Sequence, residues 1–298
     1  MQNRSFAAAV KAAFPHTIPI MTGYLAVGMA YGVLMAAKGY SFLWAGFVSA
    51  FAFCGSMQYV AITLLTTAFD PLQAFVLSLM VNARHLFFSL ALLPKYRGLG
   101  RLRYFMIYTL SDENFSLSSS VEPPEDTDPT LFYFAMSFLT WLYWVAFSML
   151  GGLLGGLISF AITGIGGHYG HLGLGADPGG PAAGKEEAMR LDTIHSLIIV
   201  AMVALATQIT RWTPFLLFSG DKKLPKVVED LGRLLPPAMM GLLVVYSLRS
   251  TDLLGGSRGI PEAIAVAVTA GLHLWRRNTL LSILAGTACY MLLVQLVF

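Results

Sequence analysis

Charge is scarce in this sequence, and so is cysteine. Only 12% of the 298 residues are charged, which is about half the fraction found in an ordinary soluble domain. The two cysteines, Cys54 and Cys289, both stand in apolar stretches. That position indicates buried thiols and gives no sign of a disulfide. The composition therefore argues against a soluble domain and against a disulfide-linked secreted one.

Three motifs that mark well-known chemistries are also missing. The sequence contains no G-x-x-x-x-G-K-[ST] phosphate loop, no H-E-x-x-H metal motif and no G-x-S-x-G nucleophile motif. Without the first, the chain is not expected to hydrolyse ATP. Without the other two, protease or hydrolase chemistry within a membrane has no support. We therefore expect a protein that is not an enzyme and that needs no metal or other cofactor.

Long apolar runs are what the sequence has in abundance. Hydrophobic residues make up 56% of the chain, and the mean hydropathy is +0.67. Several uncharged runs exceed the ~18 residues that a helix needs to cross a bilayer. The sequence therefore predicts an all-α, polytopic transmembrane helical bundle with about 8 to 10 membrane segments. The expected spans are 17–37, 41–69, 71–93, 104–121, 130–163, 192–218, 234–249, 260–275 and 279–298.

A glycine-rich stretch divides the chain. Residues 164–190, "GIGGHYGHLGLGADPGGPAAGKEEAMR", hold nine glycines and two prolines, a composition typical of a flexible linker. His168 and His171 within it are too few to favour a metal site over a solvated linker. The stretch predicts two transmembrane modules, residues 1–163 and 191–298, joined end to end.

The charges of the loops suggest an orientation. The basic residues of the 95–103 loop favour the cytoplasm, and Glu122–Asp128, which has no Lys or Arg, favours the outside. Arg4 and Lys11 also favour the inside. These preferences agree only if 41–69 enters and leaves on one side, as two half-helices broken between Cys54 and Gln58. The same count places five later basic residues outside, against the rule, so either one span is miscounted or the modules insert separately (Lys222, Lys223, Lys226, Arg276 and Arg277). In such a protein basic loops report orientation, and no nucleic-acid partner is expected.

Ionisable residues in the middle of apolar runs are the first candidates for function. Arg84 lies near the middle of the run 71–93, with Asn82 and His85 beside it. A cation at that depth needs a partner or a purpose, and the nearest acids in a neighbouring span are Asp112 and Glu113. The arginine either pairs with an acid merely to be buried, or it belongs to a functional site.

Two further stretches combine polar residues with helix-breaking ones. Gly55, Ser56 and Gln58 predict either a discontinuous helix whose freed backbone groups bind a solute, or a kink satisfied by neighbouring helices. Thr210 and Arg211 precede Pro214, which predicts either a polar break near a cation or an arginine that reaches the headgroups. A third stretch, "GGLLGG" at Gly151–Gly156, has GxxxG spacing and predicts close helix packing.

The same stretches carry a family resemblance. "GSMQYVAITLL", "NARHLFFSLALLPKYRG" and "TLSDENFSL" resemble the larger subunit of two-component branched-chain amino acid exporters, the AzlC family, over about residues 10–163. "VALATQITRWTPFLLF", "LGRLLPPAMMGLLVVYSL" and "RRNTLLSILAGTACYMLLV" resemble the small AzlD partner over about residues 189–298. The second module would then supply in cis the subunit that is usually a separate chain.

The resemblance implies export of Leu, Ile and Val, with Met, across the bacterial inner membrane by ion-gradient-coupled transport. The competing interpretation is a scaffold or a permease subunit that transports nothing itself, and whether the chain forms a homo-oligomer stays open. A zwitterionic substrate needs a cation or a helix start, an acid, and an apolar pocket. The expected substrate-binding residues are Gly55, Ser56, Gln58, Asn82, Arg84, Asp112, Glu113, Asn114, Thr210 and Arg211. Proton coupling is expected at His85, Asp112 and Glu113, because histidine titrates near physiological pH and the acids are the other groups able to carry a proton.

Overall fold

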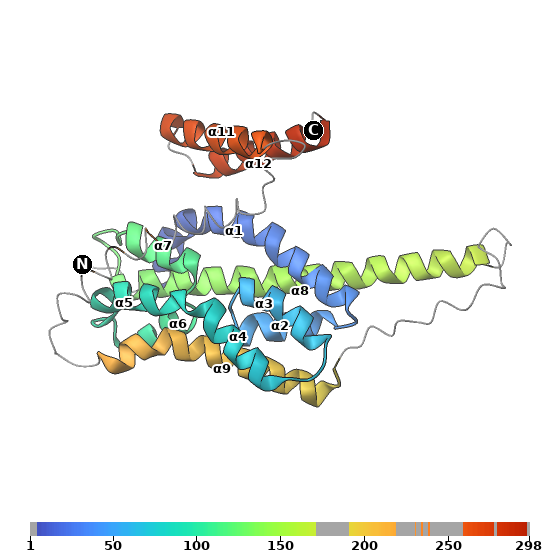
Figure 1. Cartoon of the computed structure of the whole chain (residues 1–298). Coiled ribbons are helices and arrows are strands. Elements are labelled where there is room, and N and C mark those ends of the chain that lie inside the picture. Colours follow the sequence, from blue (N-terminus) through green and yellow to red (C-terminus); the bar gives the residue numbers. More distant parts are fainter. Residues whose placement is uncertain are drawn as a thin grey trace. The chain divides into compact units, whose positions relative to one another are not determined.

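The structure, a computed structural model, describes residues 5–170, 191–218, 259–276 and 279–296, together with the single residues 230, 234 and 238. Within these ranges every regular element is a helix (Figure 1), as the sequence predicts. The chain forms two compact units, Met1–Arg233 and Leu234–Phe298. The fold class predicted from the apolar runs is thus confirmed.

Among the described residues of the first unit, three helices are long and apolar enough to cross a membrane. They are α1 (Phe6–Ala37), the first 29 residues of α8 (Pro129–Gly170) and α9 (Thr193–Leu217). Helix α8 continues through 164–170, so the beginning of the predicted linker is helical, and 171–190 lies outside the described residues. A fourth crossing comes from a pair of helices bent by 50° at a short break, α4 (Pro71–Asn82) and α5 (Arg84–Tyr96).

Two further segments consist of short half-helices. The first holds α2 (Phe42–Phe51) and α3 (Ser56–Leu65). The second holds the 3₁₀ turn η1 (Gly100–Leu102), α6 (Arg103–Tyr108) and α7 (Asp112–Ser120). Half-helices inside a membrane expose backbone groups that only protein or a water-filled cavity can satisfy. Both segments are therefore places to look for a site.

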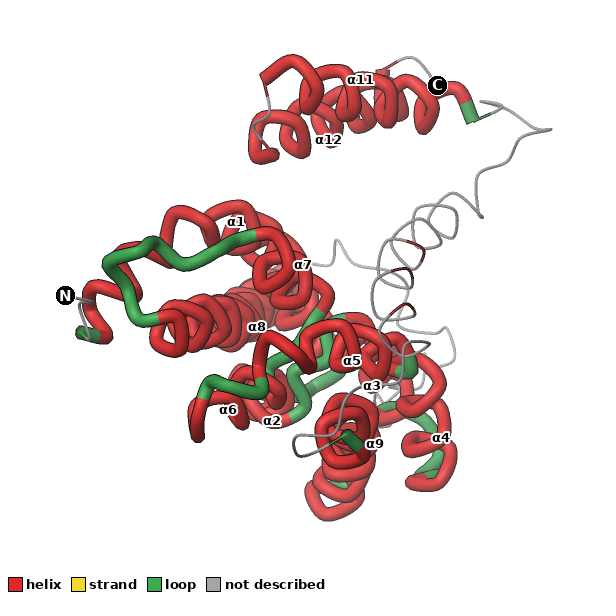
Figure 2. The backbone as a smooth tube through the Cα atoms, turned by 90° about the vertical axis from the view of Figure 1, so that its left-hand side faces the viewer, coloured by secondary structure: helices red, strands yellow, loops and turns green. Residues whose placement is uncertain are grey.

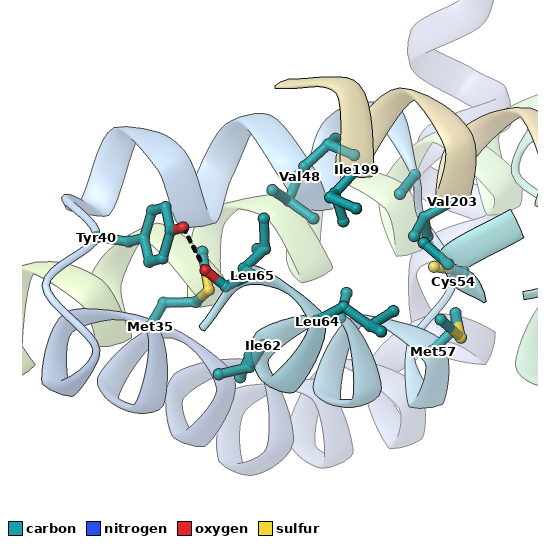
Figure 3. Packing of buried hydrophobic residues seen from close by; sticks show 14 of the residues in the cluster. Met35, Tyr40, Val48, Cys54, Met57, Ile62, Leu64, Leu65, Ile199 and Val203 are labelled. Atoms are coloured by element: carbon teal, nitrogen blue, oxygen red, sulfur yellow. Dashed lines mark hydrogen bonds between the residues drawn. The ribbon is translucent and has the colours of Figure 1, made fainter. Parts of the chain in front are cut away.

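The α2–α3 segment returns to the end of the molecule from which it starts. The Tyr40 hydroxyl, just before α2, donates to the Leu65 carbonyl at the end of α3 at 2.9 Å, and Figure 3 shows this bond far from Cys54 and Met57 at the turn. The chain reverses where Phe53 and Gly55 adopt positive φ angles of 39° and 35°, a conformation that is uncommon for any residue but glycine. The predicted break of 41–69 is confirmed, although it begins at 52 and leaves Gln58 inside α3. We call this the first hairpin, with its tip at 52–55.

The α6–α7 segment turns back as well, which corrects a prediction. The Lys95 ammonium donates to the Ser118 carbonyl at 2.6 Å and pairs with Glu122 at 3.0 Å. The loops 95–103 and 121–128 therefore lie at one end of the unit, and the prediction that they face opposite sides of the membrane is wrong. The segment 104–121 is not a span but a second hairpin, whose tip we define as 108–111, from the last residue of α6 to the residue before α7. Hydrogen bonds from Lys95 and from Tyr133 lower the pKa of the Glu122 carboxyl in this loop.

The second hairpin removes the conflict in the loop charges for the three lysines that follow α9. We call the end that carries 95–103 and 121–128 the basic end. Helix α9 begins at the other end, where the Leu191 amide donates to the Leu65 carbonyl at 3.1 Å. It ends at the basic end, where Arg97 donates to the Phe218 carbonyl at 2.6 Å. The lysine-rich sequence after Phe218, which lies outside the described residues, thus follows a helix that ends beside Arg97. The span count from the sequence was off by one segment.

Single-cysteine labelling tests this topology. In a background with Cys54 and Cys289 replaced by alanine, Arg101→Cys and Glu125→Cys should react with an impermeant maleimide from the same side of the membrane. Lys38→Cys and Asp70→Cys should react from the opposite side, because α1 and the first hairpin both end there. Labelling of Arg101→Cys and Glu125→Cys from different sides would restore 104–121 as a span.

Helices α1 and α8 approach each other very closely. A methyl group added to Gly151 would lie 2.1 Å from the Met29 carbonyl oxygen, and one added to Gly32 would lie 2.1 Å from that of Ser148. A methyl on Gly155 would also meet α1, at 2.9 Å from the Ala36 side chain. On Gly156 it would meet nothing within 4 Å among the described residues. The close packing predicted from the GxxxG spacing is confirmed for Gly151 and Gly155.

The first helix of the second module belongs to the first unit. Helix α9 packs against α3, α4 and α5 (Figure 2), and its fully buried Ile199 and Val203 join a core formed with α2 and α3 (Figure 3). The compact units therefore divide at 233, well after the predicted linker. In the second unit α11 (Ile260–Arg276) and α12 (Thr279–Leu296) pack against each other, and Tyr290 donates to Glu262 at 3.3 Å. Most of the predicted span 234–249 lies outside the described residues.

Candidate functional site

Three half-helices begin at one point of the first unit. Ser56, Arg84 and Asp112 are the first residues of α3, α5 and α7. The Arg84 guanidinium lies 3.0 Å from an Asp112 carboxylate oxygen and donates to the Ser56 hydroxyl at 2.9 Å. We call these three residues the central junction. The predicted pairing of Arg84 with a nearby acid is confirmed.

The central junction gathers charges of both signs. The start of an α-helix carries a partial positive charge, and three such starts lie beside the Arg84 guanidinium. The Asp112 carboxylate faces them, with Glu113 next to it in α7. The Arg84 Nε and the Asp112 Oδ1 atoms are buried and have no hydrogen-bond partner among the residues that the structure describes. Buried polar atoms are rarely left unpaired, so this donor and this acceptor each call for a partner that the described residues do not supply.

Space and access are available at the central junction. The Arg84 and Asp112 side chains are 16% and 24% exposed, and Ser56 is exposed. A methyl group added to Gly55, directly before α3, would meet nothing within 4 Å in the described part of the chain. Glu113 is half-buried beside Asp112 and interacts with Tyr24 of α1. A small molecule can therefore reach the charged groups.

Two predicted ligands, Gln58 and Asn114, already have protein partners. Gln58 donates to the Ser49 hydroxyl at 3.0 Å and accepts from the Trp144 indole at 2.6 Å. Asn114 donates to the Thr109 carbonyl at 2.6 Å and accepts from the Thr140 hydroxyl at 2.7 Å. Each amide is buried and ties the outgoing half of a hairpin to its incoming half and to α8. In the structure as it stands, both amides hold the hairpins in place.

The partners of these amides on α8 were missed by the sequence reasoning. Thr140 and Trp144 stand four residues apart, one helical turn, within an otherwise apolar run. Two hydrogen-bonding side chains on one face of an apolar helix are a readable signal. The sequence thus contained a hint that α8 supports both hairpins.

Asn82 and His85 lie at the α4–α5 break, against α9. The Asn82 amide donates to the Thr207 hydroxyl at 2.9 Å, and the His85 Nδ1 atom lies 3.0 Å from the Asn82 carbonyl oxygen. Both side chains are buried, and the Asn82 Oδ1 atom has no partner among the described residues. They lie next to Arg84 in sequence but are less accessible than the central junction. A role for His85 in proton coupling stays a prediction.

Arg211 is fully buried and faces the hairpin tips. Its two terminal nitrogens donate to the carbonyls of Phe53 and Tyr108, each at 2.5 Å. Helix α9 runs unbroken past Pro214, so neither alternative predicted for this stretch applies: there is no polar break, and the arginine does not reach the headgroups. Thr210 bonds to the Thr207 carbonyl of its own helix at 2.8 Å. The partners of Arg211 are backbone groups, which sequence reasoning could not identify.

These features define an all-α membrane protein whose charged site is built at the breaks of discontinuous helices. Comparison with family models assigns residues 19–158 to "AzlC protein" and residues 196–294 to "Branched-chain amino acid transport protein (AzlD)". The chain belongs to the AzlC family through its first module and carries an AzlD domain in its second. The central junction falls inside the AzlC match, and Arg211 falls inside the AzlD match.

Relatives cover one module each. "Branched-chain amino acid transport protein AzlC" of Bacillus subtilis is 42% identical over 158 residues, which are 53% of this chain and 62% of that protein. An uncharacterized membrane protein of Helicobacter pylori is 38% identical over 160 residues, or 54% of this chain and 70% of that protein. An uncharacterized protein of Haemophilus influenzae is 44% identical over 105 residues in the second module, or 35% of this chain and 96% of that protein. No solved structure matches. This chain thus joins two domains that these relatives carry separately.

Proposed function

We propose that this protein exports branched-chain amino acids, namely Leu, Ile and Val, with Met as a further substrate, across the bacterial inner membrane. The observation that carries the proposal is the central junction, an accessible charge pair at three helix starts in the middle of a membrane protein. Discontinuous helices that present their ends to a solute at mid-membrane are typical of secondary transporters. The family membership supplies the substrate class.

A zwitterion fits the groups of the central junction. Its carboxylate would bind the Arg84 guanidinium and the Ser56 hydroxyl at the start of α3, next to Gly55. Its ammonium would bind Asp112 through the unpaired Oδ1 atom, with Glu113 close by. The ring of Tyr24 on α1 would provide apolar contact for a branched side chain. Every charge of the substrate then meets an opposite one, which is what burial in a membrane protein demands.

We further propose that an ion gradient drives export and that the basic end faces the cytoplasm. Lys95, Arg97, Arg101 and Arg103 all belong to that end, and cytoplasmic loops are enriched in such residues. Protons are the ions we favour, because Asp112 and Glu113 stand at the accessible site and can carry a proton with each substrate. The absence of a phosphate-loop motif in the sequence is consistent with this energy source.

Transport by the purified full chain in liposomes tests the proposal. Vesicles loaded with unlabelled leucine should accumulate labelled leucine from outside by counterflow. Valine and isoleucine should compete with the label, and aspartate and lysine should not. An imposed pH gradient should then drive net movement. If monodisperse protein moves no leucine under any of these conditions, the competing interpretation, a scaffold or subunit without transport activity, replaces this one.

A further inference from the structure

One side chain of the second module touches the tips of both hairpins. Arg211 on α9 reaches the Phe53 carbonyl at the tip of the first hairpin and the Tyr108 carbonyl at the tip of the second. The two hairpins enter from opposite ends of the unit. Their tips therefore meet near mid-membrane, and the guanidinium lies between them.

A cation is well suited to this position. Helices α2 and α6 end at Phe51 and Tyr108, and the C-terminal end of a helix presents unpaired carbonyls with a partial negative charge. The planar guanidinium can serve two carbonyls at once, whereas an ammonium acts as a point charge. The Tyr108 hydroxyl adds bonds to the Ala50 and Phe51 carbonyls, so the end of α2 is also joined directly to the second hairpin.

The two hairpins are built alike. In each, the third residue of the outgoing half-helix is a buried amide, Gln58 or Asn114, that accepts from α8. Their donors on α8 lie one turn apart, and the hairpins approach from opposite ends. This is the arrangement of an inverted pair, and inverted pairs are a recurring design of transporters. Arg211 stands where the two members of the pair meet.

We propose that Arg211 is a positioning residue, supplied by the AzlD module, that locks the two hairpin tips together and so holds Ser56 and Asp112 on either side of Arg84. The residue does not act as a substrate ligand, because its side chain is fully buried and both terminal nitrogens already serve backbone carbonyls. Its Nε atom has no partner among the described residues, but unlike Arg84 this side chain has no exposed surface from which a solute could reach it. Its importance for transport rests on the proposed function. Its effect on the tips does not, and is measured separately below.

Cys54 reports on the tips without any transport assay. This thiol follows Phe53 directly and is 4% exposed. In full-length protein carrying Cys289→Ala, Arg211→Ala should raise the rate of Cys54 labelling by a small methanethiosulfonate at least ~10-fold, because two carbonyls lose their donor and water enters. All rates are compared after extrapolation to the fully ionised thiol from their pH dependence, because the thiolate is the reacting form and Arg211 interacts with it electrostatically. Arg211→Lys should give an intermediate rate, since lysine keeps the charge but lacks the two planar terminal nitrogens that serve both carbonyls. Thr213→Ala is the matched control on the same helix, because Thr213 bonds to the Ile209 carbonyl, and it should leave the rate unchanged.

Chemical rescue distinguishes a specific role of the guanidinium in joining the two hairpin tips from a general role of Arg211 in folding. Methylguanidinium added to Arg211→Ala should slow Cys54 labelling again, because it can refill the place of the lost side chain. Tetramethylammonium, which has the charge without donors, and urea, which has donors without the charge, should not. Labelling of Arg211→Ala at the unaltered rate overturns the proposal, and so does fast labelling of a monodisperse variant that methylguanidinium cannot slow. If Arg211→Ala is not monodisperse, the same comparison is made on Arg211→Lys, with the same two outcomes.

Transport completes the test. If the proposed function holds, Arg211→Ala should lower the maximal rate of leucine counterflow with little change in the apparent KM, and methylguanidinium should restore part of the rate. A substrate ligand would raise the KM instead, and that result would overturn the positioning role. Unchanged protection of Cys54 counts against the lock alone, whereas absence of leucine transport in the unaltered protein counts against the proposed function alone.

Discussion

Replacing Arg84 with glutamine should lower the initial rate of leucine counterflow by about 100-fold, a loss of about 2.7 kcal/mol. The substitution removes the charged donor for the substrate carboxylate and leaves Asp112, 3.0 Å away in the present structure, without its counter-ion. Removing one member of a buried charge pair costs more than the pair contributes, because the remaining charge is stranded. Glutamine is shorter but keeps a polar end that can still hydrogen-bond, so folding should survive.

Two further variants define what this result means. Arg84→Lys should retain part of the activity, because the charge remains while the bond to Ser56 or that to Asp112 is lost. The double variant Arg84→Gln with Asp112→Asn should be as stable as the unaltered protein, because it strands no charge. It should be as inactive as Arg84→Gln, because it has lost both charges that bind the zwitterion. Leucine transport near the normal rate in Arg84→Gln would mean that the substrate binds elsewhere.

Adding a single methyl group at Gly151 should destabilise the protein strongly. In Gly151→Ala the new carbon would lie 2.1 Å from the Met29 carbonyl oxygen and 2.6 Å from its Cα atom, so α1 and α8 must move apart. Overpacking of this kind costs about 1–3 kcal/mol or more, which lowers the melting temperature by roughly 5–10 °C. Thermal unfolding in detergent, followed by light scattering and size-exclusion chromatography, measures the change.

Gly156→Ala is the matched control. Gly156 belongs to the same glycine cluster, and a methyl group there meets nothing within 4 Å among the described residues. Its melting temperature should stay within about 2 °C of the original value. If both variants lost stability equally, loss of glycine itself and not the α1–α8 contact would be the cause.

The sequence predicted those features that depend on composition and local chemistry. The helical membrane fold follows from the long apolar runs, and the break before Ser56 follows from a glycine in an otherwise continuous run. The pairing of Arg84 with Asp112 also followed, because a cation in a membrane must find an acid and few acids are near.

Three features could not be read from the sequence, each for a physical reason. The second hairpin has the length of a span although its acids make it less apolar than the other segments, and only the long-range contact between Lys95 and Glu122 reveals its turn. The amides Gln58 and Asn114 signal a need for hydrogen bonds without telling whether a substrate or α8 meets it. The partners of Arg211 are backbone carbonyls. Every residue has one, so the sequence cannot indicate which carbonyls an arginine will bind.

The bond between Phe53 and Arg211 joins positions 158 residues apart, and this separation has a consequence for biosynthesis. At roughly 5–20 residues per second, the ribosome needs about 10 to 30 s after Phe53 before it has made Arg211. During that time the first hairpin lies in or beside the membrane with an unpaired tip carbonyl, where unsatisfied backbone groups are costly. Cells that make the two domains as separate chains must hold the hairpin in that state until a second polypeptide arrives. When the domains are joined in one chain, the hairpin does not depend on diffusion of a second polypeptide, and the delay is set by the rate of translation. The fusion also ensures that one α9 is made for every pair of hairpins.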